Sequence, residues 1–231
     1  MLPNIQGLRA LAALMVAVGH LQVLFAAVHP ALAWVGLGRA GVDLFFVISG
    51  FIMVFTTERE PPSAGRFALR RILRIVPLYW AVTLAVFALA ALRPGLLDAG
   101  RADPVWLAKS LAFIPFDKGD GTMNPLVPVG WTLNYEMFFY ALLALALIPP
   151  LGRARYILVA VVVAALALPG FFVSFGSDLL QFYTRPILIE FALGVGLGLA
   201  FARLPRARPV VGSLVLIAAL AALAASGLAP T

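Results

Sequence analysis

The chain contains no cysteine, and charged residues make up only 12% of its 231 residues. Without cysteine there are no disulfide bonds and no thiolate metal ligands, and two histidines on separate segments do not form a metal site, so we expect none. Soluble domains carry about 25% charged residues, roughly twice the share found here. Hydrophobic residues, in contrast, reach 63%. This balance indicates an integral membrane protein.

The formal net charge of +7 reflects an excess of arginine. Binding to nucleic acid would be one explanation for such a charge. In a membrane protein, arginines held on the cytoplasmic side explain the charge more simply. We therefore expect the lipid bilayer, and no nucleic acid, as a partner of this chain.

Seven apolar segments are long enough to cross a bilayer core, which needs roughly 20 residues per helix. They predict an all-α, multi-pass bundle of transmembrane helices that forms a single membrane-embedded domain over residues 1–231. The predicted spans are Leu8–Val28, Gly41–Thr57 or an earlier start near Val35, Ile72–Leu92, Leu126–Ile148, Tyr156–Phe175, Phe182–Ala202 and Pro209–Leu228.

The distribution of arginine predicts that the N-terminus lies in the cytoplasm. With this orientation every short loop on the cytoplasmic side is rich in arginine, as the positive-inside rule requires. These loops hold Arg59, Arg66, Arg70, Arg71, Arg74, Arg153, Arg155, Arg203, Arg206 and Arg208, while Asp117 and Asp178 fall in outer loops. The outer segment Val105–Phe116 is too short to span, and we expect an interfacial or re-entrant helix there.

Three ionisable side chains fall inside the predicted spans at a similar depth. At 1.5 Å per residue, His20 lies about 18 Å from the cytoplasmic edge, and Glu136 and Glu190 lie about 15 and 12 Å from the outer edge. Such groups are costly in a bilayer and usually face the bundle interior, so we expect a shared cavity with Asp43 above it. A carboxylate beside an imidazole would favour a general base. A buried histidine satisfied by a backbone carbonyl is the alternative.

A second cluster lies at the start of the third predicted span. If the helix has begun there, Arg70 and Arg74 are four residues apart and Arg71 and Arg74 are three apart, so all three crowd one side. Topology and attraction to anionic lipid head groups are the commonest reasons for such a cluster. The alternative is a phosphate clamp, because a planar guanidinium binds phosphate oxygens with two donors.

Four stretches resemble, in order, the motifs of the acyltransferase 3 family of bacterial integral-membrane O-acyltransferases. They are "GLRALAALMVAVGH", which contains Arg9 and His20, "GVDLFFVISGF" from Gly41, "RRILRIVPLYW" from Arg70 and "GWTLNYEMFFY" from Gly130. The stretch "EFALGVG" from Glu190 is a weaker fifth. Each stretch alone is weak evidence, and together they are highly specific.

The resemblance implies an enzyme of the bacterial inner membrane. Its donor would be a cytoplasmic acyl-CoA, often acetyl-CoA, and its acceptor a hydroxyl of a cell-surface or exported saccharide. The candidate site residues fall into three groups: His20, Glu136 and Asp43 for catalysis, Arg9, Arg70, Arg71 and Arg74 for the donor, and Trp131, Asn134 and Glu190 for the acceptor. The resemblance itself implies roles for five of them: His20 as the catalytic histidine with Arg9 as its motif partner, Arg71 and Arg74 on the CoA side, and Glu136 as the acidic position.

The chain departs from the family at its C-terminal end. Members that resemble it have more spans than the seven predicted here, and their C-terminal region with another histidine has no counterpart after Leu228. We therefore expect either a C-terminally truncated piece of a longer member or a shortened member, and an inactive truncated membrane scaffold is one alternative function. A transporter or flippase for a polysaccharide precursor is another, because intramembrane acids and broken helices also mark transport paths. The sequence leaves the acceptor, the acyl chain and the oligomeric state open.

Overall fold

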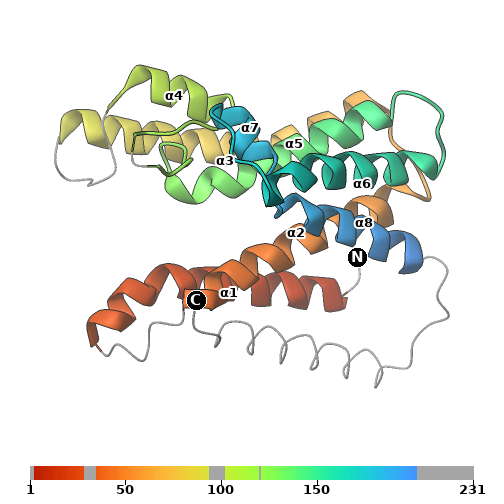
Figure 1. The fold of residues 1–231 in the computed structure, drawn as a ribbon, viewed down its shortest axis with the longest axis horizontal. Helices are drawn as coiled ribbons and strands as arrows, with labels where there is room; N and C mark the ends of the chain where they lie inside the picture. Colours follow the sequence, from red (N-terminus) through yellow and green to blue (C-terminus); the bar gives the residue numbers. More distant parts are fainter. Residues whose placement is uncertain (1–2, 29–34, 94–101, 120, 202–231) are drawn as a thin grey trace. The chain divides into compact units, whose positions relative to one another are not determined.

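A computed structural model describes residues 3–28, 35–93, 102–119 and 121–201 of the chain (Figure 1). Within these ranges every regular element is a helix, which confirms the predicted all-α class. The chain divides into two compact units. Unit 1 comprises Met1–Phe55 and Leu193–Thr231, and unit 2 comprises Thr56–Ala192.

Five helices among the described residues are long and apolar enough to cross a membrane. Their apolar windows are Asn4–Leu21, Gly38–Thr57, Ala64–Leu92, Ala154–Phe171 and Asp178–Phe201. They correspond to the first, second, third, fifth and sixth predicted spans, so the chain is a multi-pass membrane protein. The seventh predicted span, Pro209–Leu228, lies outside the described residues.

The fourth predicted span, Leu126–Ile148, is shorter than the sequence suggested. Its helix, α5, covers Trp131–Ala146 and follows a short 3₁₀ turn, η2, at Pro128–Gly130. Proline has no N–H and fixes its backbone, so Pro128 suits the start of a helix and not its interior. The 16 residues of α5 extend about 24 Å, less than the roughly 30 Å of a bilayer core.

In unit 1, α1 (Pro3–Val28) packs closely on α2 (Val35–Thr57), whose start at Val35 confirms the earlier of the two predicted starts. A Cβ atom on Gly41 would lie 2.8 Å from the carbonyl oxygen of Ala12. Only glycine allows the two helices to approach this closely.

The C-terminal part of α8 (Leu188–Phe201) also belongs to unit 1 and packs on α2. Gly194 lies against the backbone of α2 near Gly50. Phe201 meets the ring of Phe51 edge to face at 5.5 Å between ring centroids. Small residues and aromatic rings therefore hold these two helices together.

Unit 2 is built on α3 (Ala64–Leu92), which contains the predicted arginine cluster and continues through Pro77. The Ser63 hydroxyl caps its first turn by accepting a hydrogen bond from the Arg66 N–H. Helix α5 contacts both α3 and α6 (Ala154–Ala167), as Figure 1 shows. These three helices form the frame on which the candidate site is placed.

The short helix α4 (Pro104–Leu111) confirms a helix within the predicted segment Val105–Phe116. The Asp103 carboxylate caps it by accepting from the N–H groups of the second and third residues of the helix. The indole N–H of Trp80 on α3 donates to the Leu111 carbonyl at 2.9 Å, which holds α4 against α3.

The sixth predicted span, Phe182–Ala202, is broken in two. Helix α7 (Asp178–Tyr183) ends before Pro186, and α8 begins after it. The Phe182 carbonyl would pair with the N–H of residue 186 in an unbroken helix, but proline has none. This carbonyl accepts instead from the Tyr135 hydroxyl of α5 at 2.7 Å and from the Arg185 N–H at 3.4 Å, and the Tyr135 ring stacks on the Phe182 ring.

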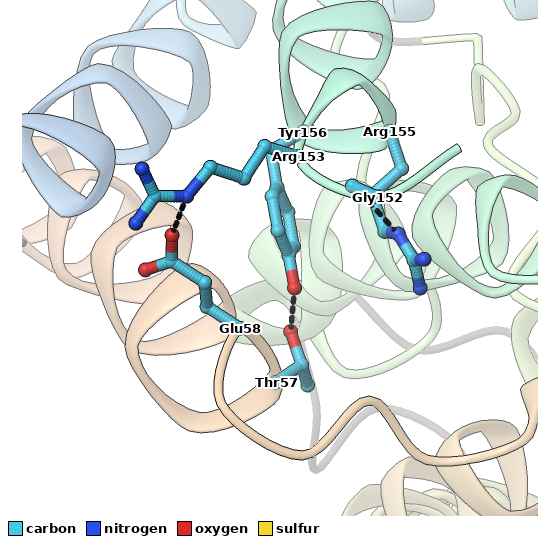
Figure 2. Close-up of polar contacts among 6 residues, drawn as sticks. All are labelled: Thr57, Glu58, Gly152, Arg153, Arg155 and Tyr156. Carbon is cyan, nitrogen blue, oxygen red and sulfur yellow. Dashed lines mark hydrogen bonds and ion pairs between the residues drawn. The ribbon is translucent and has the colours of Figure 1, made fainter. Parts of the chain in front are cut away.

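Two loops predicted to be cytoplasmic meet at one end of unit 2. Figure 2 shows the Arg153 guanidinium paired with the Glu58 carboxylate, and the Thr57 hydroxyl 2.9 Å from the Tyr156 hydroxyl. The end of α2 and the start of α6 therefore lie together, as the predicted topology requires. Which side of the membrane they face stays a prediction.

Two segments predicted to be outer loops also meet. The Asp117 N–H donates to the Asp178 carboxylate at 3.1 Å, which joins the loop after α4 to the start of α7. The pairing agrees with their common placement in the predicted topology.

Candidate functional site

Arg71 of α3 lies between two aromatic rings. Its guanidinium carbon is 5.2 Å from the ring centroid of Phe67, one turn earlier on the same helix, and 5.3 Å from that of Tyr140 on α5. The two rings are buried and meet edge to face, with their centroids 6.2 Å apart. Both rings attract the cation, so Arg71 is fixed where α3 and α5 pack together.

The Tyr140 hydroxyl donates a hydrogen bond to the Glu136 carboxylate. The two residues are four positions apart on α5, so their side chains lie on the same face of the helix. Glu136 is also close enough to Arg71 to interact with it electrostatically. We call Phe67, Arg71, Glu136 and Tyr140 the Arg71 cluster.

The Arg71 side chain has an unused donor. Its Nε atom is buried and makes no hydrogen bond within the described part of the chain. A buried donor without an acceptor is costly, and a guanidinium offers a planar set of donors that matches a phosphate or carboxylate. The arrangement can therefore receive one anionic group at the contact of α3 and α5.

Arg70 and Arg74 differ from Arg71. They lie on neighbouring turns of α3, and their side chains are exposed, whereas that of Arg71 is partly buried. Arg74 is close enough to Arg71 to interact with it electrostatically. The condition for the three arginines to be helical neighbours, that the helix has begun before them, is met because α3 begins at Ala64.

The structure brings Arg71 and Glu136 together, although the sequence had assigned them to separate clusters. The depth estimate counted from Leu126, but α5 begins only at Trp131. Glu136 therefore lies in the second turn of the helix, where Tyr140 connects it to Arg71.

Asn134 is buried in the first turn of α5. Along the chain it falls between Gly130, which approaches the Tyr79 ring, and Tyr140, whose ring meets that of Phe67. Its side chain is 1% exposed, and neither its amide nitrogen nor its amide oxygen has a hydrogen-bond partner among the described residues. A buried amide in this state has full capacity to bind a polar group.

The other two predicted acceptor residues also lie in unit 2. The Trp131 ring meets the Tyr135 ring edge to face at 5.9 Å. Glu190 is partly buried in the first turn of α8, next to Phe191, whose ring stacks on that of Phe139 in α5.

His20, Arg9 and Asp43 lie in unit 1. The close contact of Gly19 with Gly38 places the residue before His20 against α2, on which Asp43 follows Gly38. The His20 side chain is exposed, and those of Arg9 and Asp43 are partly buried. The grouping of His20 with the glutamates of unit 2 stays a prediction.

Phe67 and Tyr140 were missed by the sequence reasoning. The spacing does contain a signal, because Phe67 precedes Arg71 by four residues and Tyr140 follows Glu136 by four. On a helix this spacing places the two members of each pair side by side. An aromatic residue one turn from an intramembrane charge is thus a candidate for holding that charge.

Comparisons with known proteins give one family. The family model described as "Acyltransferase domain", that of the acyltransferase 3 family, matches residues 2–230. The chain is 39% identical to the exopolysaccharide production protein ExoZ of Rhizobium meliloti over 165 residues, which is 70% of this chain and 50% of ExoZ. No solved structure matches.

Two further relatives are similar over parts of their length. The protein named "Putative membrane-bound transacylase BcsY" of Komagataeibacter xylinus is 30% identical over 97% of this chain and 58% of its own length. The peptidoglycan O-acetyltransferase OatA of Listeria monocytogenes is 29% identical over 60% of this chain and 23% of its own length. The chain thus spans 50% and 58% of the first two relatives. Because the family model covers nearly every residue, the chain belongs to the acyltransferase 3 family.

Proposed function

We propose that this chain acts as a membrane O-acyltransferase that moves an acyl group, in the simplest case acetyl, from cytoplasmic acyl-CoA to a hydroxyl of a cell-surface or exported saccharide. Membership of the family supports acyl transfer, and the names of ExoZ and OatA support a polysaccharide acceptor. The structural observation that carries the proposal is the buried Nε of Arg71, a donor that awaits an anionic acceptor.

The donor substrate carries phosphate groups that suit the arginines of α3. We assign Arg71 to one phosphate because its guanidinium is already fixed by two rings and loses little freedom on binding. The exposed Arg70 and Arg74 add positive charge on the neighbouring turns. Arg9, which the family resemblance gives as the motif partner of His20, is also assigned to the donor as a further cation.

The proposed reaction needs one proton acceptor. His20 removes the proton from the acceptor hydroxyl, and the hydroxyl oxygen attacks the carbonyl carbon of the thioester. A carbon–oxygen bond forms and the carbon–sulfur bond breaks, and the departing CoA thiolate takes the proton from the imidazolium. Asp43, in the same unit as His20, is proposed to stabilise the charged imidazole. Glu136 is the second carboxylate assigned to this step.

The saccharide acceptor is assigned to Asn134, Trp131 and Glu190. Asn134 supports this assignment because both atoms of its buried amide lack partners in the described ranges, and sugar hydroxyls can both donate and accept. Trp131 offers an apolar ring face and Glu190 a carboxylate, which are common partners of sugar rings and hydroxyls.

Transfer can be tested on surface glycans and in isolated membranes. Mass spectrometry should find acyl groups on glycans from cells with the gene and none from cells without it, and membranes should transfer label from acetyl-CoA. His20→Ala should abolish transfer while the protein still inserts. Arg59→Gln is the matched control, since Arg59 is exposed and outside the Arg71 cluster. Full transfer by His20→Ala would refute the proposed mechanism.

A saccharide transporter is the second candidate, and the break between α7 and α8 is the observation that favours it. Discontinuous helices often surround substrate sites in transporters. This candidate predicts movement of intact saccharide without acylation, and it depends on Glu136 and Glu190 more than on Arg71. Acylated glycan in the experiment above would exclude it as the sole function.

A further inference from the structure

Resting on the proposed function, we propose that Arg185, at the break between α7 and α8, binds an anionic group of the saccharide acceptor, a carboxylate or a phosphate. The break lies within unit 2 and within a segment apolar enough to cross a membrane (Figure 1). Arg185 comes directly before Pro186, the residue that interrupts this segment. The acceptor is then an acidic saccharide and not a neutral one.

The backbone at Arg185 is held from two sides. A Cβ atom on Gly170 of η3 (Leu168–Phe171) would collide with the Thr184 carbonyl oxygen and lie 3.4 Å from the Arg185 Cα atom. Glycine at this position thus allows η3 to lie directly against the break. The N–H and the hydroxyl of Thr184 both donate to the Leu180 carbonyl, at 3.0 and 2.7 Å. Because its backbone is already fixed, Arg185 loses less freedom when it binds a ligand.

The Arg185 guanidinium contacts neutral groups. Its carbon atom lies 5.7 Å from the centroid of the Phe182 ring, within the range of a cation–π interaction. It is also close enough to the Tyr135 hydroxyl of α5 to interact with it, and this hydroxyl donates to the Phe182 carbonyl. A ring and a hydroxyl therefore orient the guanidinium and leave its charge in place.

Arg185 forms no ion pair within the described ranges, although its side chain is partly buried. Of the carboxylates nearest along the chain, Asp178 accepts a hydrogen bond from the Asp117 N–H, and Glu190 lies in the first turn of α8. A cation in a membrane-crossing segment is costly, and by default it indicates a functional site. A guanidinium presents a planar pair of donors that matches a carboxylate or a phosphate.

Membrane topology does not explain Arg185. The positive-inside rule accounts for the arginines of the cytoplasmic loops, whereas the predicted orientation places residue 185 on the outer side. An anionic lipid head group is the competing partner, because long arginine side chains near helix ends can reach the membrane interface. The experiment below separates the two.

Arg185 is connected to Trp131, which is assigned to the acceptor, through one aromatic group. The Trp131 ring meets the Tyr135 ring edge to face at 5.9 Å. The Tyr135 ring in turn stacks on the Phe182 ring, against which the guanidinium lies. An apolar surface for a sugar ring and a cation for its anionic substituent are thus built on the same side chains, and ligand sites commonly combine these two features.

The experiment pairs a change in the protein with a change in the acceptor. Glycan from cells without the gene is used untreated, after reduction of its carboxylates to alcohols, and after removal of its phosphates. Transfer of label from acetyl-CoA in open membrane fragments gives kcat/KM for each preparation. With the unchanged protein, one of the two treatments should lower kcat/KM about 10-fold or more, because a charge-assisted contact is lost.

Arg185→Gln should lower kcat/KM for the untreated glycan by a similar factor. It should not lower transfer to the sensitive treated glycan any further, because both changes remove the same contact. Arg185→Lys keeps the charge and loses the paired donors, so its kcat/KM for the untreated glycan should be intermediate. Arg93→Gln is the matched control. It removes one charge from the same predicted side at an exposed position after α3, and it should leave all values unchanged.

Several results would overturn the proposal. They are equal transfer to all three glycans by the unchanged protein, effects of treatment and Arg185→Gln that multiply, and an equal loss with every glycan, which indicates a structural role. A loss that disappears in phosphatidylcholine vesicles without phosphatidylglycerol would assign Arg185 to a lipid head group. If Arg185→Gln fails to insert, Arg185→Lys decides: a loss confined to glycan with the anionic group supports the contact, and no loss or a uniform loss overturns it.

Failure of the proposed function looks different. An unchanged protein that transfers label to none of the three glycans would refute the acyltransferase, and the role of Arg185 with it. An unchanged protein that acylates all three glycans equally would refute the role of Arg185 alone.

Discussion

At the scale of single residues, the three arginines of α3 differ in their surroundings because of the residue that stands four positions before each of them on the helix. Arg70 and Arg74 project from the helix with exposed side chains, whereas Arg71 is held by the rings of Phe67 and Tyr140. An exposed arginine keeps its water and contributes mainly to topology and to attraction of anionic lipids. A fixed arginine with a buried, unpaired Nε is prepared for one ligand.

Asn134 is a second residue whose present state favours ligand binding at the expense of stability. Its amide is buried without partners among the residues described, so it costs free energy in the absence of substrate. We expect Asn134→Leu to raise the free energy of unfolding by about 1 kcal/mol, because a leucine of similar size removes the unpaired polar atoms. The same change should lower acyl transfer about 10-fold or more, since the acceptor would lose its hydrogen bonds. Thermal unfolding in detergent measures the change in stability, and transfer of label from acetyl-CoA in isolated membranes measures the change in activity.

Thr83 of α3 is the matched control for this prediction. It is fully buried, and its hydroxyl makes no hydrogen bond within the described ranges, but it is not assigned to the site. Thr83→Val should leave acyl transfer unchanged. An Asn134→Leu variant that is less stable and fully active would show that the amide is paired in the protein and serves packing.

At the scale of helices, proline positions decide where the sequence prediction was right and where it was wrong. Helix α3 continues through Pro77 as one long element, and the arginine motif lies on it as predicted. The fourth predicted span begins late, after Pro128, and the sixth is confirmed as a membrane-crossing segment but is interrupted near Pro186, because the average apolarity of a segment does not reveal a missing N–H. The candidate site residues were predicted from motif and spacing, and their roles stay predictions. Their pairing across α3 and α5 was not, because it depends on the register between the two helices.

The hydroxyl of Tyr135 should stabilise the break between α7 and α8. Tyr135→Phe removes the shorter of the two hydrogen bonds to the Phe182 carbonyl and leaves the longer one from the Arg185 N–H, and we expect the free energy of unfolding to fall by about 1–3 kcal/mol. In a Pro186→Ala background, residue 186 gains an N–H that can donate to the Phe182 carbonyl. Tyr135→Phe should therefore lower the free energy of unfolding by less in that background. Denaturant unfolding of the two single variants and the double variant measures the coupling.

Tyr156→Phe is the control for this cycle. Its hydroxyl is also buried and pairs with the Thr57 hydroxyl, far from residue 186 in sequence. Tyr156→Phe should lower the free energy of unfolding by the same amount with proline or alanine at position 186. Equal costs of Tyr135→Phe in both backgrounds would mean that the hydroxyl does not compensate for the proline.

At the scale of the whole molecule, each end of unit 2 joins loops that the arginine pattern had placed on a common side. Glu58 and Arg153 connect the loop after α2 with the loop before α6, while Asp117 and Asp178 connect the two outer segments. The charge pattern could predict this grouping because it acts on all loops at once during insertion. It could not predict the partners, since these depend on which helix ends lie side by side.

The absence of cysteine makes the sidedness of these loops directly measurable. Single cysteines introduced as Arg59→Cys, Ala154→Cys and Thr122→Cys lie at exposed positions, and the unchanged chain gives no background. With the N-terminus inside, a membrane-impermeant maleimide should label Thr122→Cys in intact spheroplasts and the other two only after permeabilisation. Labelling of Arg59→Cys and Ala154→Cys from opposite sides would contradict the joined loops of unit 2. Reversal of all three would leave that unit intact and overturn the orientation, and with it the placement of Arg70, Arg71 and Arg74 on the side from which acyl-CoA arrives.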